Sequence, residues 1–179
     1  MSPNHKMIAY PEDTKGDKIY TVYVIDAQNG ELISSPLMGI VDSLEWANSE
    51  TLVYIAMDDI HRPFKVWRHH LGSDKSDDTC LYHEKDEEFY LELHQSERKE
   101  YHFVVSGSKT TQFVLYLNLF DPRKELKYVT QHVEGVDTVE LQAFKDYLVV
   151  YERRKCWIEL GNEEIAISNM KCSVAAITT

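Results

Sequence analysis

Cysteine is scarce in this chain of 179 residues, and what there is excludes two kinds of architecture. Cys80, Cys156 and Cys172 are odd in number and widely spaced, which argues against a disulfide framework and against a zinc site. Unpaired cysteines are typical of a reducing compartment, so we expect a cytoplasmic protein.

Positive charge and long apolar runs are also lacking. Lys and Arg number 19 against 30 Asp and Glu, a formal net charge of −11. Nucleic acid and anionic membranes need a basic surface, so we expect neither as a partner. No apolar run approaches the roughly 18 to 20 residues of a membrane span, and the first ten residues, MSPNHKMIAY, have no secretory or transit pattern. The acidity favours solubility; a weaker alternative is attraction of cationic peptides.

Metal-ligand motifs are absent. His69 and His70 are adjacent in an expected strand, so they point to opposite faces and cannot chelate one ion. No H-x-x-H or acid-flanked pair sets a ligand geometry. The other histidines considered stand singly: His61, His83, His94, His102 and His132. We expect no metal and no cofactor.

What the sequence does contain is a series of short extended segments. Between Leu44 and Asp86 no segment has the length or period of a helix. Asn48-Ser49-Glu50 and Leu71-Gly72-Ser73-Asp74 are turn signals, and Asp58 to Pro63 forms a third break. The intervening strands predict one antiparallel meander: Leu44–Ala47, Thr51–Met57, Phe64–His69 and Thr79–Tyr82.

The meander recurs along the chain. Asn4-His5-Lys6 precedes a strand at Met7, as Asn48-Ser49-Glu50 does at Thr51, Glu97–Glu100 at Tyr101 and Lys145-Asp146 at Tyr147. The repeat is roughly 44 to 50 residues with about four strands per unit, the range of a β-propeller blade. A single four-stranded sheet leaves its apolar faces exposed to solvent, so such units must stack. The alternative is an accidental run of hairpins in a β-sandwich.

The remaining segments complete the expected pattern. Gln28–Glu31 predicts a hairpin turn of the Asn-Gly kind, and Asp121–Lys124 a second turn. A fourth unit begins but does not finish, and no blade pattern follows Glu163. The fold class is therefore all-β, a partial β-propeller of about three to four blades of four antiparallel strands. The further expected strands are Asp17–Asp26, Leu32–Leu37 (an edge strand because of Pro36), Phe89–His94, Tyr101–Ser106, Thr111–Leu119, Leu126–His132, Val139–Phe144, Tyr147–Tyr151 and Trp157–Leu160.

Some polar and aromatic residues allow two interpretations. The acidic runs Asp74–Asp78 and Glu84–Glu88 indicate solvated turns, or else a rim that orients a cationic substrate or docks on another domain. Trp46 and Trp67 indicate packing between blades rather than a ligand stack. Arg62 and Arg68 cover strand edges or make interdomain salt bridges.

Several long segments resemble one family. They include SPNHKMIAYPEDTKGDKIYTVYV, LEWANSETLVYIAMD, RPFKVWRHHLGSDKSDD and LYHEKDEEFYLELHQS. The most specific parts are Val66–Gly72, Tyr82–Tyr90 and Ser108–Thr111. These segments resemble the propeller of the oligopeptidase B group in the prolyl oligopeptidase family of serine peptidases.

The resemblance is interrupted. It runs from Ser2 to about Asp137 and resumes at Val139–Lys155, which resembles a region about one blade further along in the family. We therefore expect residues 1–155 to be an incomplete N-terminal propeller domain with an apparent blade deletion near 137–139. Residues 156–179 would be a tail outside the family, and the chain a partial or spliced product.

The resemblance implies a two-domain serine endopeptidase that cleaves short peptides after Arg or Lys. Its partner would be an α/β-hydrolase catalytic domain, with the propeller excluding folded proteins. The nucleophile of that domain sits in a G-x-S-x-G elbow, which this sequence lacks; Ser106-Gly107-Ser108 is the nearest imitation. We expect no catalytic, cofactor-binding or metal residue in this chain, and predict that it is inactive alone. The alternative function is a non-catalytic interaction propeller that binds a protein partner.

Overall fold

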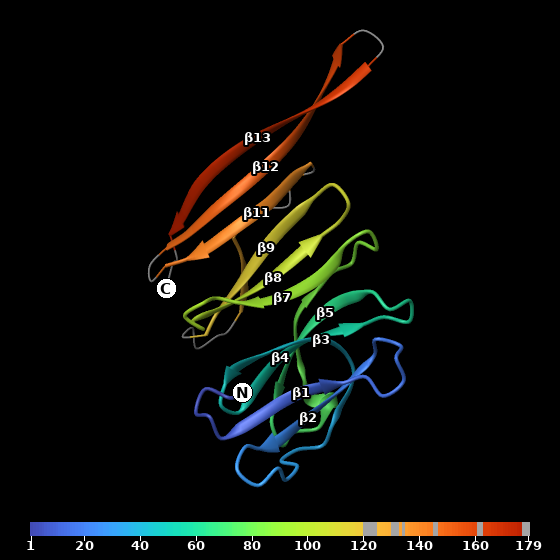
Figure 1. The fold of residues 1–179 in the computed structure, drawn as a ribbon, viewed down its shortest axis with the longest axis vertical. Helices are drawn as coiled ribbons and strands as arrows, with labels where there is room; N and C mark the ends of the chain where they lie inside the picture. The colour runs from blue at the N-terminus through green and yellow to red at the C-terminus, as the bar shows by residue number, and fades with distance from the viewer. Residues whose placement is uncertain (120–124, 130–132, 134, 145–146, 161–162, 177–179) are drawn as a thin grey trace. The chain divides into compact units, whose positions relative to one another are not determined.

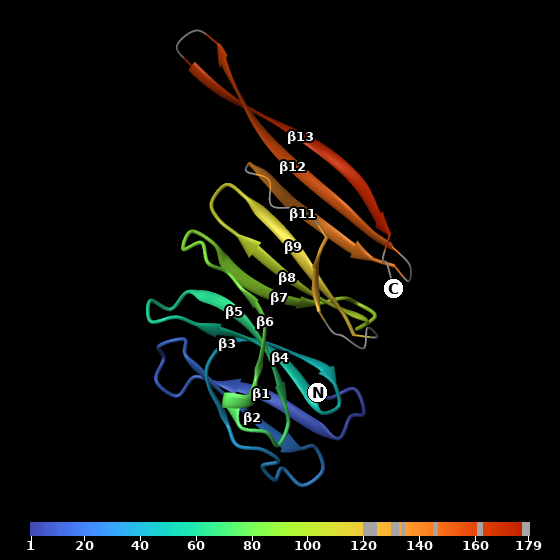
Figure 2. The ribbon, with the colours of Figure 1, turned by 180° about the vertical axis from the view of Figure 1, so that it is seen from behind.

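The structure is a computed structural model of the 179-residue chain. It describes residues 1–119, 125–129, 133, 135–144, 147–160 and 163–176 (Figures 1 and 2). The described residues form strands and one short 3₁₀ turn, η1 (Lys75–Asp77), so the all-β prediction is confirmed. The strands are β1 (Met7–Glu12), β2 (Tyr20–Asp26), β3 (Leu37–Asn48), β4 (Thr51–Met57), β5 (Pro63–His70), β6 (Thr79–His83), β7 (Tyr90–Gln95), β8 (Tyr101–Gly107), β9 (Gln112–Asn118), β10 (Leu126–Tyr128), β11 (Val136–Ala143), β12 (Tyr147–Leu160) and β13 (Glu163–Ala176).

The strands make three antiparallel sheets, with the orders β1-β2-β3-β4-β5-β6, β10-β9-β8-β7 and β11-β12-β13. By its contacts the chain divides into two units, Met1–Gln95 and Ser96–Thr179. In the first unit, β3, β4, β5 and β6 pair in chain order. The meander predicted from Leu44 to Asp86 is therefore confirmed.

β3 is longer than predicted, because it begins at Leu37 rather than Leu44. Its Leu37–Ile40 segment pairs with β2, and β4 pairs with Ile40 and again from Leu44 onward, with register shifts on both sides. Gly39 lies at the shift toward β2, where Tyr20 pairs with Ile40 and Thr21 with Met38. Its φ of +74° is a conformation that suits a bulge and that glycine adopts without strain. The bulged strand thus joins the β1-β2 hairpin to the meander in one sheet of six strands, where the sequence predicted units of four.

The predicted repeat has a local counterpart in two turns. Before β1, the Ser2 amide donates to the Met7 carbonyl at 2.8 Å, and the Met7 amide donates to the Ser2 hydroxyl at 2.9 Å. Before β8, Ser96 and Tyr101 make the same two bonds at 2.9 and 3.1 Å. His5 and Lys99 occupy equivalent positions in these turns, and both have positive φ, 59° and 58°. Two segments far apart in the chain therefore fold into the same turn.

Each unit has its own apolar core. In the first, buried residues from β2, β3 and β4 form one cluster, with β1 and β5 packed against it. In the second, residues of β8 and β9 pack against Leu148 of β12, so strands of two different sheets share one core. Such stacking of sheets is what the propeller prediction requires. The first cluster comprises Val22, Val24, Leu37, Ile40, Trp46, Leu52 and Tyr54; the second comprises Tyr101, Phe103, Val114, Tyr116 and Leu148.

The predicted strand Leu32–Leu37 does not form as one strand. Leu32 makes an isolated bridge to Ile25, and Leu37 already belongs to β3, because Ser35-Pro36 removes a backbone donor and restricts the preceding residue. Conversely, β13 pairs with β12 along its whole length, although no blade pattern was found after Glu163. The predicted turn at Asp121–Lys124 and the position of His132 lie outside the described residues.

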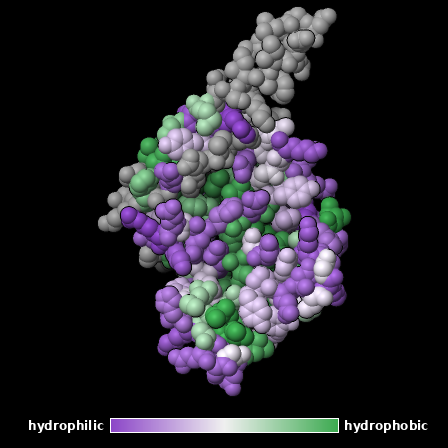
Figure 3. All heavy atoms as spheres, in the orientation of Figure 1, coloured by the Kyte–Doolittle hydropathy of each residue, from purple (hydrophilic) through white to green (hydrophobic). Residues whose placement is uncertain are grey.

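The surface of the first unit is mainly hydrophilic, with smaller apolar areas between the polar side chains (Figure 3). The exposed large apolar residues of this unit include Met38, Ile60 and Tyr90, which come from different elements. None of the described residues belongs to a helix with the length and apolar character needed to cross a membrane.

A buried carboxylate network beside an aromatic pocket

The carboxylate of Asp78 is the centre of a buried hydrogen-bond network in the first unit. The Tyr54 hydroxyl donates to Asp78 Oδ2 at 2.6 Å, and His69 Nδ1 lies 2.7 Å from Asp78 Oδ1. The side chains of His69 and Asp78 are only 1% and 2% exposed. Because an ionised carboxylate only accepts hydrogen bonds, the shared proton belongs to His69 Nδ1.

The sheet register explains how these residues meet. Leu52 pairs with His69 and Tyr54 with Trp67 across β4 and β5, so these four side chains share one face of the sheet. Asp78 is the residue after η1, the turn that leads from β5 to β6. One carboxylate therefore ties β4 and β5 to the connection that follows them.

The network shifts the proton affinity of its neighbours. Burial raises the pKa of Tyr54 well above its usual value, and the hydrogen bond to Asp78 and the charge of Asp78 act in the same direction. Burial lowers the pKa of the Lys75 ammonium, and the charge of Asp78 opposes this shift. Lys75 Nζ donates to the carbonyl of Met38 and lies 5.9 Å from the centre of the Tyr54 ring.

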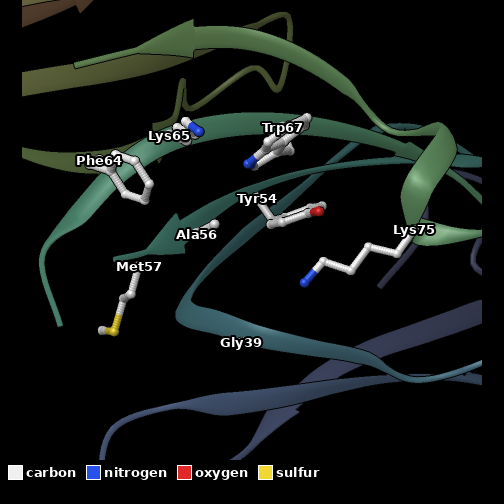
Figure 4. A pocket seen from close by; sticks show the side chains of 8 residues that line it. All are labelled: Gly39, Tyr54, Ala56, Met57, Phe64, Lys65, Trp67 and Lys75. Atoms are coloured by element: carbon white, nitrogen blue, oxygen red, sulfur yellow. The ribbon is translucent and has the colours of Figure 1, made fainter. Parts of the chain in front are cut away.

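A pocket of about 380 Å³ adjoins this network (Figure 4). Its walls come from β3, β4, β5 and η1. Lys65 Nζ lies 4.9 Å from the ring centre of Phe64 and 5.9 Å from that of Trp67, within the range of a cation–π contact. The lining residues are Gly39, Tyr54, Ala56, Met57, Phe64, Lys65, Trp67 and Lys75.

Arg62 anchors the connection between β4 and β5. Its side chain is 7% exposed, and its Nε lies 3.0 Å from Asp58 Oδ2. Its Nη1 donates to the carbonyl oxygen of Asp86 at 2.6 Å and to that of Phe89 at 3.4 Å. All these partners belong to the first unit, so Arg62 links two of its loops instead of covering a strand edge.

The interpretation of the acidic runs as solvated turns is wrong for two residues. Asp78 is buried in the network, and Glu84 is 7% exposed, with the Tyr82 hydroxyl donating to its Oε2 at 2.9 Å. A usable signal was present: His69 occupies an inward position of a predicted strand, where a buried imidazole needs a partner, and the next turn is rich in acids. The other acidic residues of the two runs lie at exposed positions, as expected of solvated turns.

The structure also places the other residues singled out in the sequence. His69 is buried and His70 exposed, which confirms that they point to opposite faces. Trp46 is buried in the first core and Trp67 packs against it, so both have packing roles. Ser108 lies in the turn between β8 and β9, where its hydroxyl accepts the amide of Thr111 at 3.2 Å.

The network stabilises the fold and is not arranged for catalysis. The Tyr54 hydroxyl and the His69 imidazole both form hydrogen bonds to the Asp78 carboxylate. The imidazole is therefore not placed to take a proton from the hydroxyl. Buried His69 Nε2 has no hydrogen-bond partner among the described residues. Within the same part of the chain, no group of three or more His, Cys, Asp or Glu could hold a metal ion.

Fold and site together define a class of protein. Short antiparallel strands in successive sheets, two of which share the apolar core around Leu148, make the chain a partial β-propeller. Residues 1–158 match the family model described as the prolyl oligopeptidase N-terminal beta-propeller domain. The chain belongs to the prolyl oligopeptidase family.

Individual relatives agree with this assignment. The chain is 33% identical over 153 residues to Protease 2 of Moraxella lacunata. The aligned region covers 84% of this chain and 22% of that protein. It is 30% identical over 98 residues to dipeptidyl aminopeptidase BI of Pseudoxanthomonas mexicana, covering 54% of this chain and 14% of that protein. The chain thus spans about a fifth or less of the curated relatives it matches.

Solved structures of similar proteins have the same fold. Oligopeptidase B from Leishmania major superimposes with a TM-score of 0.79 at 26% identity, over 84% of this chain and 21% of that one. Oligopeptidase B from Trypanosoma brucei, in a closed form with covalently bound antipain, gives 0.74 at 27% identity over the same shares.

Proposed function

We propose that this chain is the propeller portion of an oligopeptidase B-like serine endopeptidase that cleaves short peptides after Arg or Lys. In this proposal the propeller limits access to an α/β-hydrolase catalytic domain that is not part of the sequence. The observation that carries the proposal is the 33% identity to Protease 2 over 153 residues. The relatives' remaining length has no counterpart in this chain, and that is where the proposal places the triad.

Two observations support this proposal. The buried groups that resemble catalytic chemistry, Tyr54 and His69, both bond to the Asp78 carboxylate, which suits a scaffold role. The unpaired thiols of Cys80, in the first unit, and Cys172, in the second, are exposed, which supports a cytoplasmic location for the parent enzyme.

A hydrolysis assay tests the catalytic part of the proposal. The full chain is incubated with a fluorogenic dipeptide that carries Arg on the acyl side of the scissile bond. We expect no turnover above buffer, because the sequence lacks a G-x-S-x-G elbow and the buried Tyr54 hydroxyl donates to a carboxylate rather than to the His69 imidazole. Turnover that a serine-directed inhibitor blocks would contradict this expectation.

A chimera tests the filtering role. Residues 1–137 replace the matching segment of Protease 2 from Moraxella lacunata, whose own catalytic region supplies the chemistry. We expect the chimera to cleave the Arg dipeptide and its Lys analogue. It should leave intact a folded protein that contains Arg and Lys. Cleavage of the folded protein at a comparable rate would refute the filter. The mass of the endogenous protein then separates an intact peptidase from a free interaction module.

A further inference from the structure

The pocket of the first unit combines apolar walls with cationic groups. Three aromatic rings, those of Tyr54, Phe64 and Trp67, face the same hollow as Met57 (Figure 4). Two lysines, Lys65 and Lys75, complete the lining, which contains no acidic residue. This local composition is opposite in sign to the chain as a whole, with its formal net charge of −11.

The two ammonium groups are held over aromatic faces and are poor in hydrogen-bond acceptors. Lys65 Nζ lies near the rings of Phe64 and Trp67, and Lys75 Nζ lies near the ring of Tyr54. Lys75 gives one hydrogen bond to the Met38 carbonyl, whereas an ammonium group has three donors. The ion pairs described for this unit involve neither lysine, although the charge of Asp78 acts on Lys75 from beyond the pocket lining. An incoming anion would therefore find donors available at two sides of the pocket.

The walls are fixed before any ligand arrives. The Tyr54 hydroxyl donates to Asp78, which fixes the position of this lining ring. Trp67 packs against the buried core of the unit. The volume of about 380 Å³ is near the lower end of the roughly 300 to 1,000 Å³ found for small-molecule sites. A ligand the size of a single amino-acid derivative suits this space.

We propose that this pocket binds small carboxylates with an aromatic or branched apolar body. The carboxylate would lie between the Lys65 and Lys75 ammonium groups, and the apolar body would pack on Tyr54, Phe64 and Trp67. Charge-assisted hydrogen bonds from ammonium to carboxylate set the orientation, and burial of apolar surface supplies affinity. The lowered pKa of Lys75, caused by burial, agrees with a cation that gains from an added negative charge. The inference does not depend on the proposed peptidase function.

The test uses the full chain and three probes of nearly equal shape: 3-phenylpropionate, 3-phenylpropanol and 3-phenylpropylamine. Binding is measured by titration calorimetry and by the shift of the Trp67 indole N–H in nitrogen-15 correlation spectra. We expect the carboxylate to bind at ~1 mM or tighter and the alcohol about tenfold more weakly. The amine should bind more weakly still, because both lysines repel it.

Variants of the two lysines separate specific from adventitious binding. Lys65→Met and Lys75→Met keep the aliphatic stem and remove the charge, and each should weaken 3-phenylpropionate about fivefold. Lys15→Met makes the same charge change at an exposed site away from the pocket and should leave the affinity unchanged. Circular dichroism checks that all three variants remain folded.

Any of four results would overturn the proposal. The first is equal affinity for the amine and the carboxylate. The second is full retention of carboxylate binding in both pocket variants once their fold is confirmed. The third is an unchanged Trp67 indole signal in the unmodified chain at about 10 mM 3-phenylpropionate. The fourth is a loss of affinity in Lys15→Met equal to that in Lys75→Met.

Discussion

Asp78 holds two buried polar groups, so its removal should cost more than the removal of either partner. Asp78→Ala leaves the Tyr54 hydroxyl and the His69 imidazole without their acceptor. We expect it to lower the free energy of unfolding by about 3 kcal/mol or more, since unpaired buried polar groups carry their full desolvation cost. Urea unfolding followed by tryptophan fluorescence measures the change.

Two other variants calibrate this result. Tyr54→Phe removes one hydroxyl and its single hydrogen bond, so its cost should be about 1 kcal/mol. Asp77→Ala deletes a neighbouring carboxylate that is exposed, and its effect should stay within about 0.5 kcal/mol. If Asp77→Ala cost as much as Asp78→Ala, the turn rather than the network would be responsible.

The raised pKa of Tyr54 predicts a loss of stability at alkaline pH. Its ordinary value is 10.0, and burial raises it in the folded chain. Below about pH 10 Tyr54 keeps its proton in both the folded and the unfolded chain, so its full contribution to the free energy of unfolding is present. Above that pH the unfolded state loses the proton while the folded state keeps it. The free energy of unfolding should therefore fall by up to about 1.4 kcal/mol per pH unit from this residue.

Comparison with Tyr54→Phe isolates that contribution. The variant lacks the ionisable group, so its free energy of unfolding should decline less steeply between about pH 10 and 11. The other tyrosines and the lysines titrate equally in both proteins. Parallel pH profiles for the two proteins would show that Tyr54 does not keep its proton.

At the scale of elements, Arg62 links the β4–β5 connection to the segment that leads into β7. Arg62→Met removes the guanidinium that binds Asp58 and the carbonyl oxygens of Asp86 and Phe89. We expect a destabilisation of about 2 to 4 kcal/mol, because three acceptors lose a charged donor. Hydrogen exchange at the Phe89 amide, which donates to Asp86 at 3.2 Å, should accelerate with it.

Arg98→Met is the matched control, because Arg98 is exposed and the variant makes the same change of charge. Its free energy of unfolding and the Phe89 exchange rate should match those of the unmodified chain. If Phe89 exchanged equally slowly in Arg62→Met, the link between the two loops would not depend on the guanidinium.

The sequence predicted the meander well because its strands are β-branched, aromatic and bounded by turn residues. Thr51–Met57 corresponds to β4 residue for residue, since its run of apolar side chains is buried on both faces. The extension of β3 was missed, because a bulge at Gly39 changes the pairing without changing the hydrophobic pattern. β13 was missed because backbone pairing with β12 continues through the polar Ser168–Lys171 segment.

The candidate site was less predictable than the fold. Trp67 and His69 were singled out from the sequence, but Asp78, the partner of His69, was assigned to solvent. The contact joins a strand to a turn nine residues further along, and depends on η1 reversing the chain. Local pattern fixes which face His69 occupies, but not which of the neighbouring acids reaches it.

For the whole molecule, the last sheet raises the question of association. β13 ends the order β11-β12-β13, and its Met170 and Val174 are 60% and 66% exposed. A long edge strand with exposed apolar residues can pair with a second copy. We expect sedimentation velocity to show concentration-dependent dimers or larger species, and Val174→Lys to reduce them.

Ile60→Lys is the control for that experiment, because Ile60 is 75% exposed on a loop of the first unit. It adds the same charge without touching β13 and should leave association as it is. A compact, monodisperse monomer at all concentrations would contradict the expectation for the unmodified chain.

The divided pairing of β3 has a consequence for how this domain tolerates change. Residues Leu37–Ile40 pair with β2, and the pairing with β4 is irregular between Ile40 and Leu44 before it becomes regular. An insertion or slip in the N-terminal hairpin can be absorbed in that stretch, so it is not transmitted to the Leu44–Tyr54 pairing beyond it. Changes in the length or register of the β1-β2 hairpin can therefore accumulate without altering the strand register that brings Tyr54 to Asp78.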